Sequence, residues 1–251
     1  MPSNPKERLA IALDLPSERD ALQLVDRLGD TCQWFKVGME LYYATGNSIV
    51  TKLRDRGFNI FLDLKLHDIP NTVAGAVRSA TQAGASLLTI HASGGQAMMT
   101  AAAEAAAAAG SPRLLAVTVL TSMDCSELAA IGIAASPADQ VLRLAKLAQA
   151  SGIDGMVCSP EEVAMLRKET GPATLLVIPG IRPAGAGISA GSERDDQKRI
   201  ATPAGAIANG ASMLVVGRPI TRAADPAAAA QAILKNIEEA IEQTQSASVQ
   251  K

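Results

Sequence analysis

Short, mainly apolar runs recur along the chain, and most are followed by a segment with helical spacing. Apolar runs that lack a polar alternation are typical of strands buried on both faces, as in parallel sheets. The pattern therefore predicts eight strands, most of them separated by helices. They are expected at Leu9–Leu13, Trp34–Val37, Asn59–Leu64, Ser86–Ile90, Leu114–Leu120, Gly155–Cys158, Thr174–Ile178 and Ser212–Val216.

Helices are predicted between the strands, and some carry recognisable start signals. Ser17 is a suitable N-cap for a helix that ends near Leu28, because its hydroxyl can accept a hydrogen bond from the first turn. Pro70 suits the first turn of a helix that ends at Ala83. Further helices are expected up to Gly57, over the Ala-rich run near 97–109, up to Ala150, from Pro160 to Lys168 and from Pro226 to Gln243.

Eight such units in 251 residues indicate a (β/α)8 TIM barrel. We expect a single domain over residues 1–251, with frayed ends at about 1–7 and 246–251. The alternative is a doubly wound open sheet, which a Gly-rich dinucleotide turn after the first strand would favour. The chain has Asp14-Leu15-Pro16-Ser17 at that point, so the barrel is preferred.

The composition indicates what kind of core the protein has and which kinds of partner are not expected. Aromatic residues make up only 2%, so the core is expected to be aliphatic. The formal net charge of -2 provides no basic field for nucleic acid. No stretch is long and apolar enough to span a membrane. Cys32, Cys125 and Cys158 are far apart and form no C-x-x-C, which indicates a reducing compartment without disulfides or a zinc site. We expect a cytoplasmic protein.

Charged residues stand where the predicted strands end, and active sites of this fold lie at that end of the barrel. They are Asp14 after the first strand, Lys36 near the end of the second, and Asp63, Lys65 and Asp68 at or after the end of the third. Asp63 and Lys65 are two positions apart, so on a strand both side chains point to one face. The alternative to a functional role is a salt bridge that only fills the end of the barrel. Grouping so many charges is costly, however, unless they have a function or are fully paired.

The alternating signs of these residues have a chemical meaning. A lysine between carboxylates stays protonated, because each negative neighbour favours its charged form. Such a lysine is a poor nucleophile and a well-placed proton donor. Two carboxylates beside a substrate anion would repel it. That repulsion is relieved if the reaction discharges the anion, for example by loss of carbon dioxide.

Glycine and arginine follow each of the last two predicted strands, in Pro179-Gly180-Ile181-Arg182-Pro183 and in Gly217-Arg218. Arginine presents a planar fork to phosphate oxygens, and loops after strands seven and eight are the recurring phosphate position of this fold. The pattern therefore predicts a phosphate site. The enlarged loop over 183–196 is predicted to be a lid, with a disordered insertion as the alternative. Gln197, near its far end, reaches a ligand only if the loop folds over.

The segment from Ile60 to Val73, Ile-Phe-Leu-Asp-Leu-Lys-Leu-His-Asp-Ile-Pro-Asn-Thr-Val, resembles the signature of the orotidine 5'-phosphate decarboxylase family. A bare D-x-K-x-x-D also occurs in related sugar-phosphate barrels, whereas the full segment ending in D-I-P-x-T is more specific. The resemblance covers almost the whole chain, from Leu9–Asp14 through Val117–Met123 and Pro179–Pro183 to Gly217-Arg218.

This resemblance implies an enzyme without metal or organic cofactor that converts orotidine 5'-monophosphate to UMP and carbon dioxide in de novo pyrimidine biosynthesis. It implies that Lys65 donates the proton to C6, that Asp63 lies beside the substrate carboxylate, and that Asp68 enters from the other subunit of a homodimer. Lys36 completes the implied catalytic network. The implied substrate-binding residues are Asp14 and Lys36 at the ribose, with Thr72 from the partner chain; Thr121 and Ser122 at the pyrimidine; and Arg182, Gln197, Gly217 and Arg218 at the phosphate.

Two alternatives stay open. One is a related metal-dependent synthase or epimerase with the D-x-K-x-x-D pattern. An epimerase of this fold needs metal-binding His and Asp residues on its early strands, and the only two histidines are His67 and His91, which we interpret as structural. The other is a catalytically silent phosphate-binding barrel. It would keep the arginines and lose Lys65 or Asp63, and both of these residues are present.

Overall fold

Eight parallel strands close into a barrel in the order of the chain, and the last strand pairs with the first. The computed structural model describes residues 4–183 and 199–249. The strands are β1 (Leu9–Ala12), β2 (Trp34–Gly38), β3 (Asn59–Leu66), β4 (Leu87–His91), β5 (Arg113–Val117), β6 (Gly155–Val157), β7 (Leu175–Ile178) and β8 (Met213–Val216). The predicted (β/α)8 barrel is therefore confirmed.

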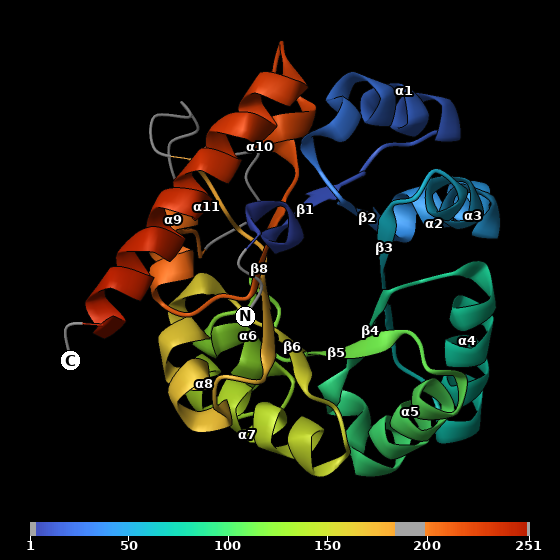
Figure 1. Cartoon of the computed structure of the whole chain (residues 1–251). Helices are drawn as coiled ribbons and strands as arrows, with labels where there is room; N and C mark the ends of the chain where they lie inside the picture. The colour runs from blue at the N-terminus through green and yellow to red at the C-terminus, as the bar shows by residue number, and fades with distance from the viewer. Residues whose placement is uncertain (1–3, 184–198, 250–251) are drawn as a thin grey trace.

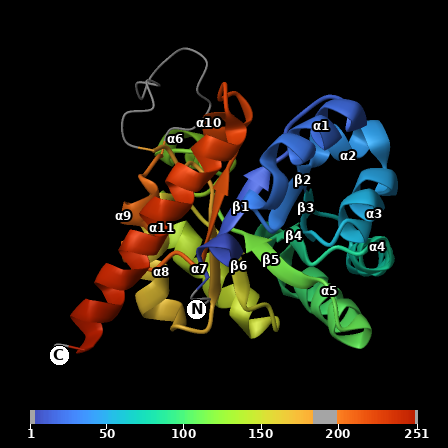
Figure 2. The ribbon, with the colours of Figure 1, turned by 45° about the horizontal axis from the view of Figure 1, so that its top comes forward.

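Helices surround the strands, as Figure 1 shows. The α-helices are α1 (Glu18–Leu28), α2 (Met39–Thr45), α3 (Asn47–Asp55), α4 (Pro70–Ala83), α5 (Gly95–Ala109), α6 (Cys125–Ala130), α7 (Pro137–Ala150), α8 (Val163–Thr170), α9 (Pro203–Ala208), α10 (Arg218–Thr221) and α11 (Pro226–Val249). Short 3-10 helices are η1 (Pro5–Arg8), η2 (Gly29–Thr31), η3 (Ala92–Gly94) and η4 (Pro160–Glu162). In Figure 2 the long α11 lies along the outside of the barrel, and its C-terminal end projects beyond the other helices.

The core has two apolar layers, one inside the barrel and one between the barrel and the helices. Ala10, Phe61 and Leu115 are buried in the inner layer. Successive side chains of a strand point to opposite faces, so Asp63, two residues after Phe61, lies on the inner side of β3 above this layer. The apolar filling of the barrel thus ends below the charged residues at its mouth.

Most predicted elements lie close to their predicted positions. The hydroxyl of Ser17 caps α1 by accepting a hydrogen bond from the backbone N–H of Asp20 at 3.2 Å. The helix α4 has the predicted bounds. The helical stretch expected up to Gly57 consists of two helices, because Gly46 adopts a positive φ of 61° and separates α2 from α3. The fifth strand ends at Val117 and not at Leu120.

The two ends of the chain also differ from the prediction. The last helix continues to Val249 and not to Gln243, since no glycine or proline interrupts residues 243–249. Residues Pro5–Arg8 form η1 where a frayed end was expected. The guanidinium of Arg8 is buried and donates to the backbone carbonyls of Ala211 and Ser212, which attaches this segment to the start of β8.

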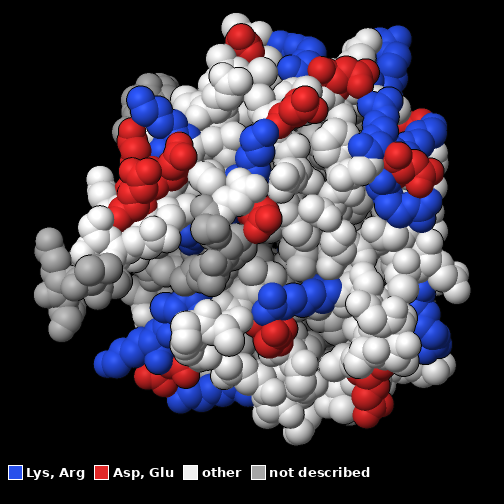
Figure 3. Space-filling view, viewed as in Figure 1, with Lys and Arg blue, Asp and Glu red and all other residues white. Residues whose placement is uncertain are grey.

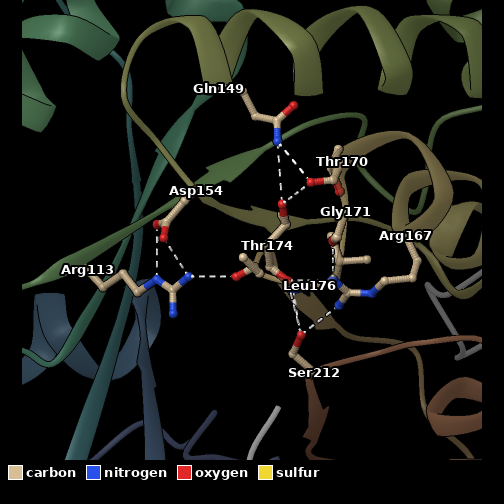
Figure 4. Close-up of polar contacts among 10 residues, drawn as sticks. Arg113, Gln149, Asp154, Arg167, Thr170, Gly171, Thr174, Leu176 and Ser212 are labelled. Atoms are coloured by element: carbon tan, nitrogen blue, oxygen red, sulfur yellow. Dashed lines mark hydrogen bonds and ion pairs between the residues drawn. The ribbon is translucent and has the colours of Figure 1, made fainter.

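A second arginine joins the chain segments below β7 and β8 (Figure 4). The guanidinium of Arg167 donates to the carbonyl oxygens of Gly171, Thr174 and Gly210 and to the hydroxyl of Ser212, at 2.7–3.0 Å. These acceptors come from the end of α8 and from the segments that lead into β7 and β8. Arg167 therefore satisfies several backbone carbonyls at the closed end of the barrel.

Charged side chains of both signs lie near one another on the face shown in Figure 3, with uncharged surface between the clusters. This mixture of signs agrees with the small formal net charge of -2. Among the helices in residues 4–183 and 199–249, none combines the length and the apolar character needed to cross a membrane.

We predict that Arg167→Met lowers the free energy of unfolding by about 2–4 kcal/mol, because several carbonyls lose their donor. Arg113→Met is the matched control. Arg113 also carries a bidentate interaction, with Asp154 at 2.7 and 3.0 Å, but that pair is exposed and should contribute less than about 1 kcal/mol. Urea denaturation at one fixed protein concentration measures both values. Equal losses for the two variants would contradict this interpretation of the Arg167 contacts.

Candidate active site

A cavity of about 760 Å³ opens at the C-terminal end of the barrel strands, which is a usual size for a small-molecule site. Apolar side chains of the inner barrel layer, such as Phe61 and Val215, form part of its wall. Much of the polar lining comes from two groups of segments. Asp14, Lys36, Asp63 and Lys65 come from the loop after β1 and from β2 and β3, and Gly180, Arg182, Gly217 and Arg218 follow β7 and β8.

Four charged side chains of alternating sign form a continuous row on the first side of the cavity. Lys36 Nζ donates to Asp14 Oδ1 at 2.8 Å and lies 3.5 Å from Asp63 Oδ2. The other oxygen of the same carboxylate, Asp63 Oδ1, accepts a hydrogen bond from Lys65 Nζ at 2.8 Å. The structure thus brings together four of the residues singled out in the sequence, with Asp63 between two ammonium groups.

Mutual attraction keeps the buried members of this row charged. Burial by itself lowers the pKa of Lys36, but the carboxylates of Asp63 and Asp14 outweigh it and hold the pKa above its ordinary value. Burial by itself raises the pKa of Asp63. Lys36 and Lys65, together with hydrogen bonds from Lys65 and Thr89, outweigh it and hold that pKa below its ordinary value. Asp63 is therefore an anion and Lys36 a cation at neutral pH.

Strand β3 is irregular around Asp63 and Lys65. Leu62 pairs with Leu88 and Leu66 with Ile90, so β3 advances four residues while β4 advances two. Within this bulge Lys65 has a φ of 50°, in the left-handed region. A residue with a Cβ in this region is less stable by about 1–2 kcal/mol than in an ordinary conformation. The expectation that a regular strand aims Asp63 and Lys65 at one face is therefore incomplete: both reach the cavity, but through a distorted backbone.

The hydroxyl of Thr89, on β4, contacts both residues of the bulge. It accepts a hydrogen bond from the backbone N–H of Lys65 at 2.8 Å and donates to Asp63 Oδ1 at 3.0 Å. Thr89 is fully buried. The sequence analysis assigned no role to Thr89, because a threonine in an apolar strand is an ordinary core residue, and only the register of the bulge places it here.

Gly38 is a second residue without an assigned role, and it lies beside the Asp14–Lys36 pair. A Cβ at this position would lie 2.9 Å from Lys36 Nζ and 3.0 Å from Asp14 Oδ1. Any side chain here would displace one of the two groups. Glycine at the end of β2 thus leaves room for the ion pair, whereas its φ of -89° is open to other residues.

The segments after β7 and β8 face the other side of the cavity. Gly180 has a positive φ of 74°, and its carbonyl accepts a hydrogen bond from the backbone N–H of Ala201 at 3.2 Å. The N–H of Arg182 donates to the carbonyl of Ala201 at 2.9 Å, so Ile181 and Ala201 form a short parallel bridge. This bridge joins the two ends of the predicted lid. Residues 184–198, with Gln197, lie outside the described part of the chain.

A buried ion pair lies at residue 199, where the described part of the chain resumes. Arg199 and Glu162 are 8% and 4% exposed, and the Arg199 guanidinium binds the Glu162 carboxylate. A second guanidinium nitrogen donates to the carbonyl of Leu120 at 3.1 Å, and Leu120 directly precedes Thr121. Sequence reasoning assigned no role to Arg199 or Glu162. Their contacts connect the segment that begins at Arg199 with the loop that follows β5.

The structure does not place every candidate residue in the cavity of its own chain. Thr121 lines the cavity, whereas Ser122 is exposed and is not part of its wall. Asp68 and Thr72 are also exposed and outside the wall, and Asp68 Oδ1 accepts a hydrogen bond from the N–H of Ile69 at 2.6 Å. The structure therefore does not bring Asp68 and Thr72 together with the charged side chains that line the cavity of the same chain.

The two histidines lie next to each other at the edge of this region. Their rings are 5.5 Å apart between centroids. Burial, His67 and Lys65 lower the pKa of His91 below its ordinary value. Across residues 4–183 and 199–249, no three His, Cys, Asp or Glu side chains are grouped so that they could hold a metal ion.

Known proteins resemble this chain over most of its length. The family model described as "Orotidine 5'-phosphate decarboxylase / HUMPS family" matches residues 7–233. A relative from Halorhodospira halophila named orotidine 5'-phosphate decarboxylase is 54% identical over 231 residues, covering 92% of this chain and 95% of the relative. A relative of the same name from Vibrio campbellii is 48% identical over 237 residues, covering 94% and 97%.

Solved structures agree with this relationship. The crystal structure of orotidine 5'-phosphate decarboxylase from Lactobacillus acidophilus superposes with a TM-score of 0.80 at 41% identity, covering 92% of this chain and 99% of the other. The matched residues 7–233 contain all eight strands and the charged row at the barrel mouth. The chain therefore belongs to the orotidine 5'-phosphate decarboxylase / HUMPS family.

Proposed function

We propose that this chain decarboxylates orotidine 5'-monophosphate to UMP and carbon dioxide in de novo pyrimidine biosynthesis, in the cytoplasm and without a metal or organic cofactor. The observation that carries the proposal is the row Asp14–Lys36–Asp63–Lys65 on one side of a 760 Å³ cavity, with Arg182 and Arg218 among its other lining residues. Relatives at 48–54% identity bear the name of this activity, which supports the same reaction here.

Lys65 is the proposed proton donor. In the proposed step the bond between C6 of the pyrimidine and the carboxylate carbon breaks, its electron pair stays on C6, and carbon dioxide leaves. The Lys65 ammonium stabilises the negative charge on C6 and then transfers one proton to it. This gives UMP and a neutral amine, which takes a proton from water. The Asp63 carboxylate repels the substrate carboxylate before the reaction, and this repulsion ends when carbon dioxide leaves.

The surroundings of Asp63 support the proposed independence from a cofactor. Its two oxygens face the ammonium groups of Lys36 and Lys65 at 3.5 and 2.8 Å, so the positions that a metal ion would take beside this carboxylate are filled by cations of the protein. These ammonium groups supply the positive charge that a metal ion supplies in other lyase sites.

The other candidate residues are proposed to hold the substrate. Charge-assisted hydrogen bonds from arginine and backbone N–H groups after β7 and β8 suit a phosphate, which then places the pyrimidine near Lys65. Binding energy at this remote phosphate supports the chemical step. The proposed contacts are Asp14 and Lys36 with the ribose, Thr121 and Ser122 with the pyrimidine, and Arg182, Gln197, Gly217 and Arg218 with the phosphate.

We expect Lys65→Ala to lower kcat by at least about a thousandfold, because the reaction loses both its cation and its proton donor. Arg218→Ala should mainly raise KM, by about 10- to 100-fold, because one charge-assisted contact with phosphate is lost. Loss of the absorbance of orotidine 5'-monophosphate measures both constants.

Lys146→Ala serves as a control, since Lys146 lies on the outside of α7 with its side chain 60% exposed. Its activity should equal that of the unmodified protein. Near-native turnover of Lys65→Ala would show that Lys65 is not the proton donor.

A homodimer is proposed to complete the site, with Asp68 and Thr72 reaching the cavity of the partner. Both are exposed at the end of the barrel that carries the cavity, yet neither lines the cavity of its own chain. Large apolar side chains are exposed on the neighbouring segments, namely Tyr43 on α2 at 82% and Ile69 before α4 at 67%. Apolar side chains of this size favour a protein interface, and a C2 dimer would use the same surface on both copies.

Subunit exchange tests this shared site. Lys65→Ala and Asp68→Ala are each expected to be inactive, but a hybrid dimer contains one site with both residues intact. An equal mixture should therefore recover about a quarter of the unmodified activity, since half of the dimers are hybrids with one working site each.

The matched control replaces the Asp68→Ala partner with the double variant Lys65→Ala/Asp68→Ala, whose hybrids contain no intact site. No recovery in the first mixture, with hybrid dimers demonstrated by native mass spectrometry, would refute the cross-subunit role of Asp68.

A further inference from the structure

Thr89 is the buried polar side chain that contacts both Asp63 and Lys65 from a neighbouring strand. It follows Leu87 on the inner side of β4, where Leu87 belongs to the apolar filling of the barrel. A valine has the same shape and would suit this buried position without a hydroxyl to desolvate. The hydroxyl therefore needs an explanation beyond packing.

The directions of its hydrogen bonds are fixed by its partners. A hydroxyl has one proton to donate and can accept elsewhere. The Lys65 N–H can only donate, so Thr89 accepts there, and its single proton remains for Asp63 Oδ1, which as a carboxylate can only accept. Thr89 thus binds the backbone of one reactive residue and the side chain of the other through the same oxygen atom.

The hydrogen bond between the Lys65 N–H and Thr89 lies where β3 is distorted. Lys65 adopts a left-handed φ of 50° within the bulge between Leu62 and Leu66, and its N–H points to Thr89 Oγ1. Asp63 Oδ1 accepts hydrogen bonds from both Thr89 Oγ1 and Lys65 Nζ, at 3.0 and 2.8 Å. The hydroxyl, the carboxylate and the lysine therefore close a ring of contacts around the bulge.

We infer that Thr89 is a positioning residue for the decarboxylation: its hydroxyl holds the Lys65 backbone in the left-handed conformation and orients the Asp63 carboxylate. Thr89 is not among the residues that line the cavity, so the proposed effect passes through Lys65 and Asp63. The inference rests on the proposed function, since it assigns Lys65 and Asp63 their catalytic parts. Thr89 should then affect kcat and leave binding of the nucleotide phosphate and ribose nearly unchanged.

The test compares Thr89→Val, which keeps the shape and removes the hydroxyl, with Thr89→Ser, which keeps the hydroxyl. Thr89→Val should lower kcat by about a hundredfold, the loss typical of a small displacement of reactive groups, with KM changed by less than about threefold. Thr89→Ser should keep kcat within about fivefold of the unmodified protein. A crystal structure of Thr89→Val should show the Lys65 backbone or the Asp63 carboxylate displaced.

Thr118→Val is the matched control. Thr118 is also a buried threonine, and its hydroxyl donates to the carbonyl of Val157 on a neighbouring strand at 2.9 Å. This hydrogen bond does not involve Asp63 or Lys65. Its kcat should be unchanged even where the melting temperature falls. If Thr89→Val does not fold, Thr89→Ala carries the same expectation for kcat.

Several outcomes would overturn the inference. They are a native kcat for the variant without the hydroxyl, a loss in Thr89→Ser as large as in Thr89→Val, or an equal loss in Thr118→Val. Failure of the proposed function gives a different result, since the unmodified protein would then not decarboxylate orotidine 5'-monophosphate at all. In that case an undisplaced Lys65 and Asp63 in the Thr89→Val crystal structure would refute the positioning role independently of activity.

Discussion

The Asp63 carboxylate, placed between the ammonium groups of Lys36 and Lys65, is the interaction on which the rest of the site depends. Each of its oxygens faces one lysine, and Asp14 binds the far side of Lys36. Removing one member would leave a buried charge without its partner, which is more costly than the pair itself is stabilising. The alternation of signs therefore keeps Lys36 and Asp63 charged in a place where burial by itself disfavours both charged forms.

The barrel makes this arrangement possible because it brings the ends of strands far apart in sequence to one opening. The charged row comes from the loop after β1 and from β2 and β3, and the glycine–arginine turns follow β7 and β8. Below the opening, apolar side chains fill the barrel, and at the closed end Arg8 and Arg167 bind carbonyls around the starts of β7 and β8. A stable, well-packed barrel can thus hold a distorted backbone at the C-terminal ends of its strands, and this distortion is the left-handed conformation of Lys65.

The sequence predicted the fold and much of the site because both depend on local patterns. Apolar runs alternating with helical segments predicted the barrel, and the charge at strand ends predicted the convergence of Asp14, Lys36, Asp63 and Lys65. The contacts that depend on register were not predictable. Thr89 contacts Asp63 and Lys65 from a different strand, and Arg199 binds Glu162 from a different segment. The local sequence around these residues does not indicate these long-range contacts. Helix ends such as Val249 were missed because no stop residue is present.

The central claim is that cations of the protein, and not a metal ion, carry the decarboxylation and that one of them supplies the proton. Turnover of orotidine 5'-monophosphate by the unmodified protein in D2O, with an excess of chelator, tests this claim directly. Carbon dioxide should be released at the same rate with and without chelator. Each UMP should also carry one deuterium at C6, delivered by an exchanged Lys65 ammonium. No release of carbon dioxide, or a loss of turnover with chelator that a divalent metal restores, would contradict the claim.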